Sequence, residues 1–253
     1  MLYKGTVEIT KVAWTVAGRR LTAAAGSVVG NRYDADYDVV HLDAGRPLAV
    51  LADGMGAGAG STAAGRTAVD VFLDRLPEAV EAPALRVAVA AAEQEVRRAG
   101  RTLNELTGCT LVAFVAGPEA WLLSVGDSRA YRLRNGLLEL LTADHTIAWM
   151  GLVHGWFAYD SAEARAARYR LTRYVGHPED PEPDLLSVSL NPGDVYLLCT
   201  DGVSDQLSYE RLNEALSATA DPAATVHTLL SDSLAAGGDD NATAVVIRVE
   251  QTL

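Results

Sequence analysis

The hydrophobic pattern in the first half of the chain changes from strand-like to helical near residue 60. Residues 5–50 contain short apolar runs separated by turns, and the last run, RPLAVLA, is apolar enough for a strand buried on both faces. Apolar residues then recur at helical spacing, and Ser61 or Thr62 can cap the first of two predicted helices. These helices cover residues 61–76 and 85–106.

The second half of the chain is predicted to contain further strands, an irregular region, and then a strand, two helices and a final strand. The strand-like runs are 110–117, 120–126, 130–136, 137–141, 195–202 and 241–250, and the two helices are 208–218 and 222–236. Residues 144–180 are irregular apart from a short helical piece at 161–170. Because strands and helices are grouped rather than alternating, the pattern favours mainly antiparallel sheets with helices packed outside.

Length and composition indicate one large domain. The 253 residues are 49% hydrophobic, which is enough for a sizeable core, so we expect a single domain over residues 1–253. No apolar run is long enough to span a bilayer, and MLYKGTVEIT lacks the pattern of a signal peptide. Cys109 and Cys199 lie in apolar strand-like contexts, so no disulfide is expected. These features predict a soluble, cytoplasmic protein with no membrane partner.

The charge balance argues against nucleic acid as a partner. The net charge is −12 at pH 7, from 33 acidic and 21 basic residues. Nucleic-acid binding needs clustered Lys and Arg, whereas the clusters here are short pairs such as Arg19-Arg20. The surplus of carboxylates either keeps the protein in solution or gathers some of them around metal ions.

Acidic residues recur beside the ends of apolar strands. They are Asp34, Asp36, Asp38, Asp53, Asp127, Asp201, Asp239 and Asp240. One such aspartate is usually a turn former, but several at neighbouring strand ends repel one another unless a divalent cation lies between them. Ligands that are all oxygen, without a His or Cys cluster, favour Mg²⁺ or Mn²⁺.

The glycine-rich stretch LAVLADGMGAGAGSTAAG, residues 48–65, has two interpretations. A strand, a glycine-rich turn and a helix can bind a nucleotide phosphate, or the turn can present Asp53 at the end of its strand. The glycines do not complete G-x-G-x-x-G before the helix, and no acidic residue ends a strand about 20 residues later. The second interpretation is therefore preferred.

Seven short motifs occur in an order typical of one enzyme family. They are DADYD (34–38), DGMG (53–56), GCTL (108–111), GDSR (126–129), TRYVG (172–176), TDG (200–202) and DNAT (240–243). With them the chain resembles the metal-dependent serine/threonine protein phosphatases of the protein phosphatase 2C type, as a bacterial single-domain member, over about residues 26–250. Each motif is weak alone, but the ordered set is specific.

The resemblance implies a fold and a function. The fold is α+β, a four-layer α-β-β-α sandwich with the metal centre at one edge and a flap at about residues 144–176. The implied reaction is hydrolysis of phosphoserine and phosphothreonine in proteins by a water that bridges two Mn²⁺ or Mg²⁺ ions, with a third ion in bacterial members. The substrate would be a phosphorylated protein made by a serine/threonine kinase, and the enzyme a monomer. The alternative is an inactive member that binds phosphoproteins as a regulatory module.

The resemblance also implies site residues. The metal ligands would be Asp36, Asp53, Gly54, Asp127, Asp201 and Asp240. Asp53 would bridge two ions, and Asp127 with Asp201 would hold the third. Asp53, Asp201 and Arg32 would be the residues on which catalysis depends.

The first motif departs from the family pattern. Family members usually carry an arginine, which grips the substrate phosphate, five residues before the first metal-binding aspartate. That position is Asn31 if Asp36 is the ligand, and Arg32 would take over the contact. If Asp38 is the ligand instead, Arg32 lies six residues before it. The choice among Asp34, Asp36 and Asp38 stays open.

Further residues near the motifs have their own expected roles. Met55 stands where many eukaryotic members have a histidine, so a metal-bound water is the expected proton source. His145 is expected to make a structural hydrogen bond. The flap contains four large apolar residues, which form either a small core or a docking surface for a protein substrate: Trp149, Met150, Trp156 and Phe157.

Overall fold

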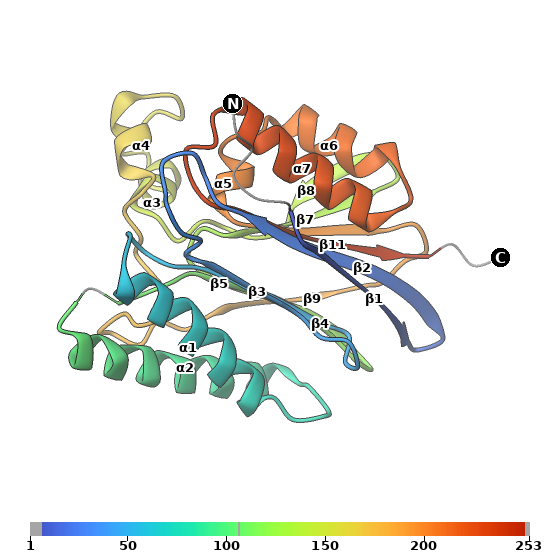
Figure 1. Cartoon of the computed structure of the whole chain (residues 1–253), viewed down its shortest axis with the longest axis horizontal. Coiled ribbons are helices and arrows are strands. Elements are labelled where there is room, and N and C mark those ends of the chain that lie inside the picture. Colours follow the sequence, from blue (N-terminus) through green and yellow to red (C-terminus); the bar gives the residue numbers. More distant parts are fainter. Residues whose placement is uncertain (1–6, 106, 251–253) are drawn as a thin grey trace.

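Two antiparallel sheets lie face to face in the computed structural model, which describes residues 7–105 and 107–250 (Figure 1). The first sheet has the order β1-β2-β11-β10-β7-β8 and the second the order β3-β4-β5-β6-β9. The strands are β1 (Ile9–Val16), β2 (Arg19–Val28), β3 (Asp38–Leu42), β4 (Leu48–Asp53), β5 (Leu111–Ala116), β6 (Ala120–Val125), β7 (Arg129–Arg134), β8 (Leu137–Leu140), β9 (Asp184–Val188), β10 (Val195–Cys199) and β11 (Ala242–Val249).

Helices cover the outer face of each sheet and complete four layers. The helices are α1 (Ala59–Arg75), α2 (Ala82–Leu103), α3 (Ile147–Val153), α4 (Ala162–Ala167), α5 (Asp201–Ser204), α6 (Tyr209–Ala218) and α7 (Pro222–Ala236). The pair α1 and α2 packs on the second sheet, and α5 to α7 pack on the first (Figure 1). The predicted α+β sandwich is therefore confirmed.

Alternation along the strands divides the apolar residues among three cores. In β5, Leu111, Ala113 and Val115 face α1 and α2. The residues between them, including Val112 and Phe114, face the other sheet. Side chains of a strand point alternately to its two faces, so a strand covered on both faces is apolar throughout. This is why the RPLAVLA run, which becomes β4, shows no alternation of polar and apolar residues.

Several local features differ from the sequence-based prediction. The first helix begins at Ala59 with Gly58 as N-cap, and Ser61 donates its hydroxyl hydrogen bond to the Met55 carbonyl instead of capping the helix. The sequence pattern does not show β9, α3 or α5. The second helix is present as α2, and Leu106, which the pattern includes, lies outside the described residues.

The flap, residues 144–176, carries α3 and α4 at one end of the sandwich (Figure 1). Phe157 packs its ring against Gly151, so it belongs to a small internal contact of the flap. Trp149, Met150 and Trp156 remain exposed, and Trp156 stacks on His154 at 5.2 Å between ring centroids. The flap therefore combines a small packed contact with an exposed apolar surface.

Both cysteines are buried free thiols, as expected. Among the described residues, no helix combines the length and the apolar character needed to cross a membrane.

A buried glutamate links α2 to the end of the flap. Glu93 is 1% exposed, and its Oε2 accepts a hydrogen bond of 2.5 Å from the Gly176 backbone N–H. Its Oε1 is buried without a partner. Burial is the main cause that raises the pKa of Glu93 to about 7, and the Gly176 hydrogen bond opposes the shift.

Glu93 should make the stability of the fold depend on pH. Because the pKa is raised in the folded state, the folded protein binds this proton more tightly. The contribution to the free energy of unfolding is thus complete below about pH 4.5 and lost as the pH rises through about 7. A shift of this size corresponds to about 3 kcal/mol. We expect Glu93→Gln to remove this pH dependence, so that the stability of the variant relative to the wild type increases from pH 5 to pH 8.

Chemical unfolding in EDTA at a series of pH values measures this difference. Glu95→Gln is the matched control, since Glu95 lies on the same helix, is partly exposed and pairs with Arg98. Parallel stability curves for the wild type and Glu93→Gln would contradict the assignment.

Candidate functional site

Strand ends from both sheets meet at one edge of the sandwich and bring acidic residues together. Asp38 begins β3 and lies opposite Asp53, the last residue of β4. On the other sheet, β10 ends two residues before Asp201, which opens α5. Asp240 lies just before β11, the strand that pairs with β10. The antiparallel ladders thus place residues far apart in sequence around one point.

Asp53 is at the electrostatic centre of this group. Burial and then the carboxylates of Asp38, Asp201, Asp127 and Asp240 hold its pKa well above the ordinary range. The pKa of Asp201 is raised by burial and then by Asp240 and Asp205, and that of Asp127 by burial and then by Asp201. Such mutual shifts mean that these carboxylates are close enough to repel one another.

The carboxylates open into a small pocket of about 180 Å³. It is lined by Tyr33, Tyr37, Asp53, Gly54, Met55, Gly56, Thr110, Asp127, Tyr169, Leu171, Asp201, Asp240 and Asn241. Tyr169 and Leu171 belong to the flap, so the flap forms part of the wall. None of the lining residues is a lysine, arginine or histidine.

The structure distinguishes Asp38 from Asp36. The Asp38 Oδ2 accepts hydrogen bonds from the hydroxyls of Thr200, at 3.0 Å, and Thr243, at 2.7 Å, which lie in the TDG and DNAT motifs. Asp36 instead accepts a hydrogen bond of 2.6 Å from the Ser27 hydroxyl. Asp38, and not Asp36, is therefore the residue of DADYD that lies against Asp53.

Two glycines allow the backbone segments of the site to approach closely. A Cβ on Gly54 would lie 2.7 Å from the Ser61 carbonyl oxygen, so this glycine lets α1 pack against the end of β4. A Cβ on Gly202 would lie 2.0 Å from the Asn241 carbonyl oxygen. Contacts this short exclude any residue with a Cβ unless the backbone moves. Steric crowding therefore explains why glycine follows aspartate in the DGMG and TDG motifs.

Short hydroxyl contacts connect the segments that carry the acidic residues. The Thr110 hydroxyl accepts a hydrogen bond of 3.0 Å from the Asp53 backbone N–H and lies 2.7 Å from the Ser128 hydroxyl, next to Asp127. Asp240 is held by the Asn241 backbone N–H, which donates to its Oδ1 at 2.8 Å. The GCTL, GDSR and DNAT motifs therefore fix the positions of Asp53, Asp127 and Asp240.

The donor set fits divalent cations. The Asp201 Oδ1 is buried without a hydrogen-bond partner, although it lies among other carboxylates. Buried carboxylate oxygens normally have partners, so an oxygen of this kind suits a cation. No three His, Cys, Asp or Glu side chains of residues 7–105 and 107–250 form a ready-made metal cage. The fit therefore rests on the repulsion among the carboxylates and on the chemistry of oxygen donors.

The structure does not bring Arg32 into the pocket. Its side chain is 69% exposed, and its guanidinium lies 2.9 Å from the carboxylate of Asp239. Arg129 makes a bidentate ion pair with Asp144, at 2.9 and 2.6 Å. Neither arginine lines the pocket, so the expected arginine grip on phosphate is not present in this arrangement.

His145 has a structural role, as expected. Its Nδ1 accepts a hydrogen bond of 3.1 Å from the Gly126 backbone N–H, so its Nε2 carries the proton and faces Asp184 at 3.1 Å. Burial lowers the pKa of His145, which keeps the ring neutral. Because Gly126 precedes Asp127, His145 supports the turn that presents this carboxylate.

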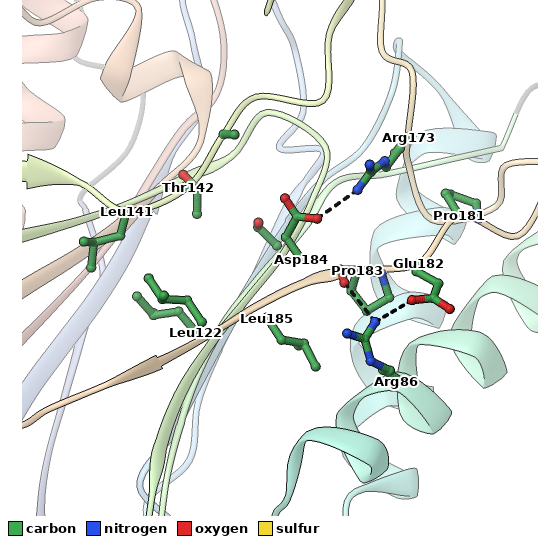
Figure 2. A pocket seen from close by; sticks show the side chains of 13 residues that line it. Arg86, Leu122, Leu141, Thr142, Arg173, Pro181, Glu182, Pro183, Asp184 and Leu185 are labelled. Carbon is green, nitrogen blue, oxygen red and sulfur yellow. Dashed lines mark hydrogen bonds and ion pairs between the residues drawn. The ribbon is translucent and has the colours of Figure 1, made fainter. Parts of the chain in front are cut away.

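Asp184 also borders a larger pocket of about 730 Å³, separate from the acidic one (Figure 2). Figure 2 shows Arg173 paired with Asp184, and Arg86 bonded to Glu182 and to the Pro183 carbonyl. Each of these charged groups is already paired with an oppositely charged side chain or a carbonyl oxygen. The floor is made of leucines such as Leu122 and Leu185, so this pocket has no unpaired group that points to a reaction.

Comparisons with known proteins relate this chain to one family. The sequence profile described as protein phosphatase 2C matches residues 29–236. The serine/threonine protein phosphatase PstP of Mycobacterium tuberculosis is 34% identical over 231 residues, which cover 88% of this chain and 43% of PstP. The chain thus spans less than half the length of this curated relative.

Solved structures extend the similarity to the fold. The catalytic domain of PstP in complex with two manganese ions superposes with a TM-score of 0.80 at 33% identity, covering 91% of this chain and 99% of that chain. PppA, a regulatory component of a secretion system in Pseudomonas aeruginosa, gives a TM-score of 0.79 at 34% identity, with 90% and 97% covered. The chain belongs to the protein phosphatase 2C family.

Proposed function

We propose that this chain hydrolyses phosphoserine and phosphothreonine in proteins with the help of divalent cations. The observation that carries the proposal is the convergence of five carboxylates at one edge of the sandwich, with the Asp201 Oδ1 left without a partner. Family membership and the names of the relatives, which are serine/threonine protein phosphatases, support the same activity. No feature of the described residues favours a regulatory module without activity, since such a module has no need for carboxylates that repel one another.

The cations would be held at the acidic pocket. The proposed ligands are Asp38, Asp53, Gly54 through its carbonyl, Asp127, Asp201 and Asp240. Asp38 replaces Asp36 in the set because it is the residue against Asp53, acting directly or through a water. Oxygen donors of this kind suit Mn²⁺ or Mg²⁺, and the manganese in the PstP domain favours Mn²⁺. A third, weaker ion beside Asp127 stays part of the proposal.

The chain's own residues position the charges and leave the pocket accessible. When bound, the cations supply an activated water and screen the negative charge of the phosphate dianion. Thr200 and Thr243 orient Asp38, and Thr110 holds the Asp53 backbone. With Met55 in the wall and no histidine or lysine among the lining residues, the leaving alkoxide would take its proton from water.

The same proposal covers the substrate, the extent of the domain and the cellular compartment. The substrate would be a protein phosphorylated by a serine/threonine kinase, and residues 1–253 would be one catalytic domain whose flap, 144–176, borders the pocket. The two buried free thiols support action in a reducing compartment such as the cytoplasm.

The first test is the activity itself. We expect hydrolysis of a phosphothreonine peptide and of p-nitrophenyl phosphate in Mn²⁺ or Mg²⁺, and complete loss in EDTA. Asp201→Asn should lower kcat by at least about 100-fold, since it removes a charge that the cations need. Activity that survives EDTA, or none in Mn²⁺, would reject the proposal.

The second test chooses between two aspartates of one motif. Asp38→Asn should weaken Mn²⁺ binding by at least about 10-fold, because loss of a ligand or of a residue that orients ligands costs this much. Asp36→Asn is the matched control, with the same chemical change two residues away, and should weaken it much less. Calorimetric titration with Mn²⁺ measures both variants, and a larger loss in Asp36→Asn would show that the ligand is Asp36.

The third test concerns the repulsion itself. Asp53→Asn removes the charge on which four other carboxylates act, so its metal-free form should be more stable than the metal-free wild type. We expect Tm to rise by about 2–4 °C in EDTA, equivalent to about 1 kcal/mol. In saturating Mn²⁺ the order should reverse, since the wild type gains stability by binding. Thermal melts in both conditions test this, and a lower Tm of Asp53→Asn in EDTA would contradict it.

A further inference from the structure

Glu93 is a buried acid on α2 that lies outside the acidic pocket and outside the seven motifs. It is 1% exposed, its Oε2 accepts a hydrogen bond of 2.5 Å from the backbone N–H of Gly176, the last flap residue, and its Oε1 is buried without a partner. An ionised carboxylate with an unpaired oxygen in such a place costs stability, whereas an amide side chain would carry no charge. The acid is therefore a candidate for a role in function.

Three adjacent backbone segments connect the end of the flap to the acidic pocket. In the middle segment, Cys109 exchanges both backbone hydrogen bonds with Val175, at 3.1 and 2.8 Å. On the other side of this segment, the Gly108 carbonyl accepts a hydrogen bond of 2.9 Å from the Met55 backbone N–H. Residues 53–55 line the acidic pocket. A displacement of Val175 would therefore be passed to the pocket wall through the GCTL motif.

Glu93 holds the residue that follows Val175 in the chain. A second side chain of α2, that of Arg97, donates a hydrogen bond of 2.9 Å to the His177 carbonyl, one residue further along. His177 lies beyond the paired segment, whereas Gly176 adjoins it. Of these two contacts from α2, the contact made by Glu93 is therefore the one that acts directly on the paired backbone segments.

Ionisation of Glu93 favours separation of the flap end from α2. Burial is the main cause that raises the pKa of Glu93 to about 7; the Gly176 N–H and then Arg97 oppose the shift, and Asp180 adds to it. The titratable and charged groups around Glu93 are Arg97, Cys109, Tyr174, His177 and Asp180. Below about pH 7 the neutral acid suits its buried position, and above it a charge lies beside an oxygen without a partner. Movement of the flap end away from α2 would hydrate that charge.

We propose that Glu93 is a positioning residue: by holding Gly176 at the flap end it fixes the pocket wall at residues 53–55, and its ionisation loosens this hold. The inference rests on the proposed function for what the pocket binds. It assigns a role in the site to one residue of α2, whose other buried residues belong to the hydrophobic core.

Amide hydrogen exchange measures this hold directly. In the full chain with saturating Mg²⁺, followed by NMR at pH 6 and pH 8, the amides of Cys109 and Val175 should open with a lower free energy than those of the central strand β11. Between these pH values their opening constant should rise by about 10-fold beyond the pH effect on intrinsic exchange, because the pKa is about 7 in the closed state and 4.5 in the open state. Glu93→Gln keeps an acceptor for the Gly176 N–H and cannot ionise, so its opening constant should not change with pH.

Binding of Mn²⁺ measures whether the hold reaches the pocket. Glu93→Ala leaves the Gly176 N–H without its acceptor, so calorimetric titration at pH 6 should show an affinity for Mn²⁺ about 10-fold weaker than that of the wild type, the effect of one unpaired buried donor. Glu93→Gln retains the acceptor and should restore the affinity. Glu95→Ala is the matched control on the same helix, since Glu95 is partly exposed and pairs with Arg98, and it should bind Mn²⁺ as the wild type does.

The outcomes distinguish this inference from the proposed function. Opening of Cys109 and Val175 only at the free energy of β11, or the same pH dependence in Glu93→Gln as in the wild type, would overturn the inference. Full affinity for Mn²⁺ in a folded Glu93→Ala would overturn it as well, and if this variant does not fold, the exchange of the wild type and of Glu93→Gln decides. A wild type with the expected exchange that hydrolyses no phosphothreonine peptide would reject the proposed function and leave the hold by Glu93 supported.

Discussion

Repulsion among carboxylates at the edge where the two sheets meet is the constraint on which the rest of the structure depends. Asp53 lies among four other aspartates, and burial followed by their charges raises its pKa well above the ordinary range. Hydrogen bonds within the protein relieve this only in part, since the Asp201 Oδ1 has no partner. The surrounding residues keep the charges close: threonine hydroxyls hold Asp38, and Gly202 allows close contact with the Asn241 backbone. The fold therefore holds carboxylates close together against their electrostatic repulsion, and divalent cations can relieve this repulsion.

Under the proposed function, the same charges would limit how the site binds a phosphate. A phosphate dianion in a pocket with acidic walls would be repelled without cations, so we expect cations to bind before the substrate. Basic side chains would compete with the cations for the same carboxylates. Around this pocket they are tied elsewhere, Arg129 to Asp144 and Arg32 to Asp239. Neutral donors and the apolar flap residue Leu171 make up much of the remaining wall.

Much of the fold follows from the sequence, and most of the acidic residues named from it lie together at one pocket. The rest depends on contacts between distant segments. The strands β4 and β5 are recognisable because both faces are buried, which leaves uninterrupted apolar runs. The edge strand β9 has exposed positions and no such run, and α5 is a single turn, so neither has a clear pattern. Asp34, Asp36 and Asp38 alternate along the chain, and contacts with distant segments, such as the pairing of Asp38 with Asp53, distinguish them.

Anomalous scattering from Mn²⁺-soaked crystals tests most directly whether the carboxylate cluster is a cation site. We expect anomalous peaks within the acidic pocket, beside Asp53 and Asp201, with Asp38 and Asp240 bordering them and Asp36 apart. No peak at the pocket at a saturating Mn²⁺ concentration, or a peak beside Asp36 and away from Asp53, would contradict the assignment of these carboxylates as the metal centre.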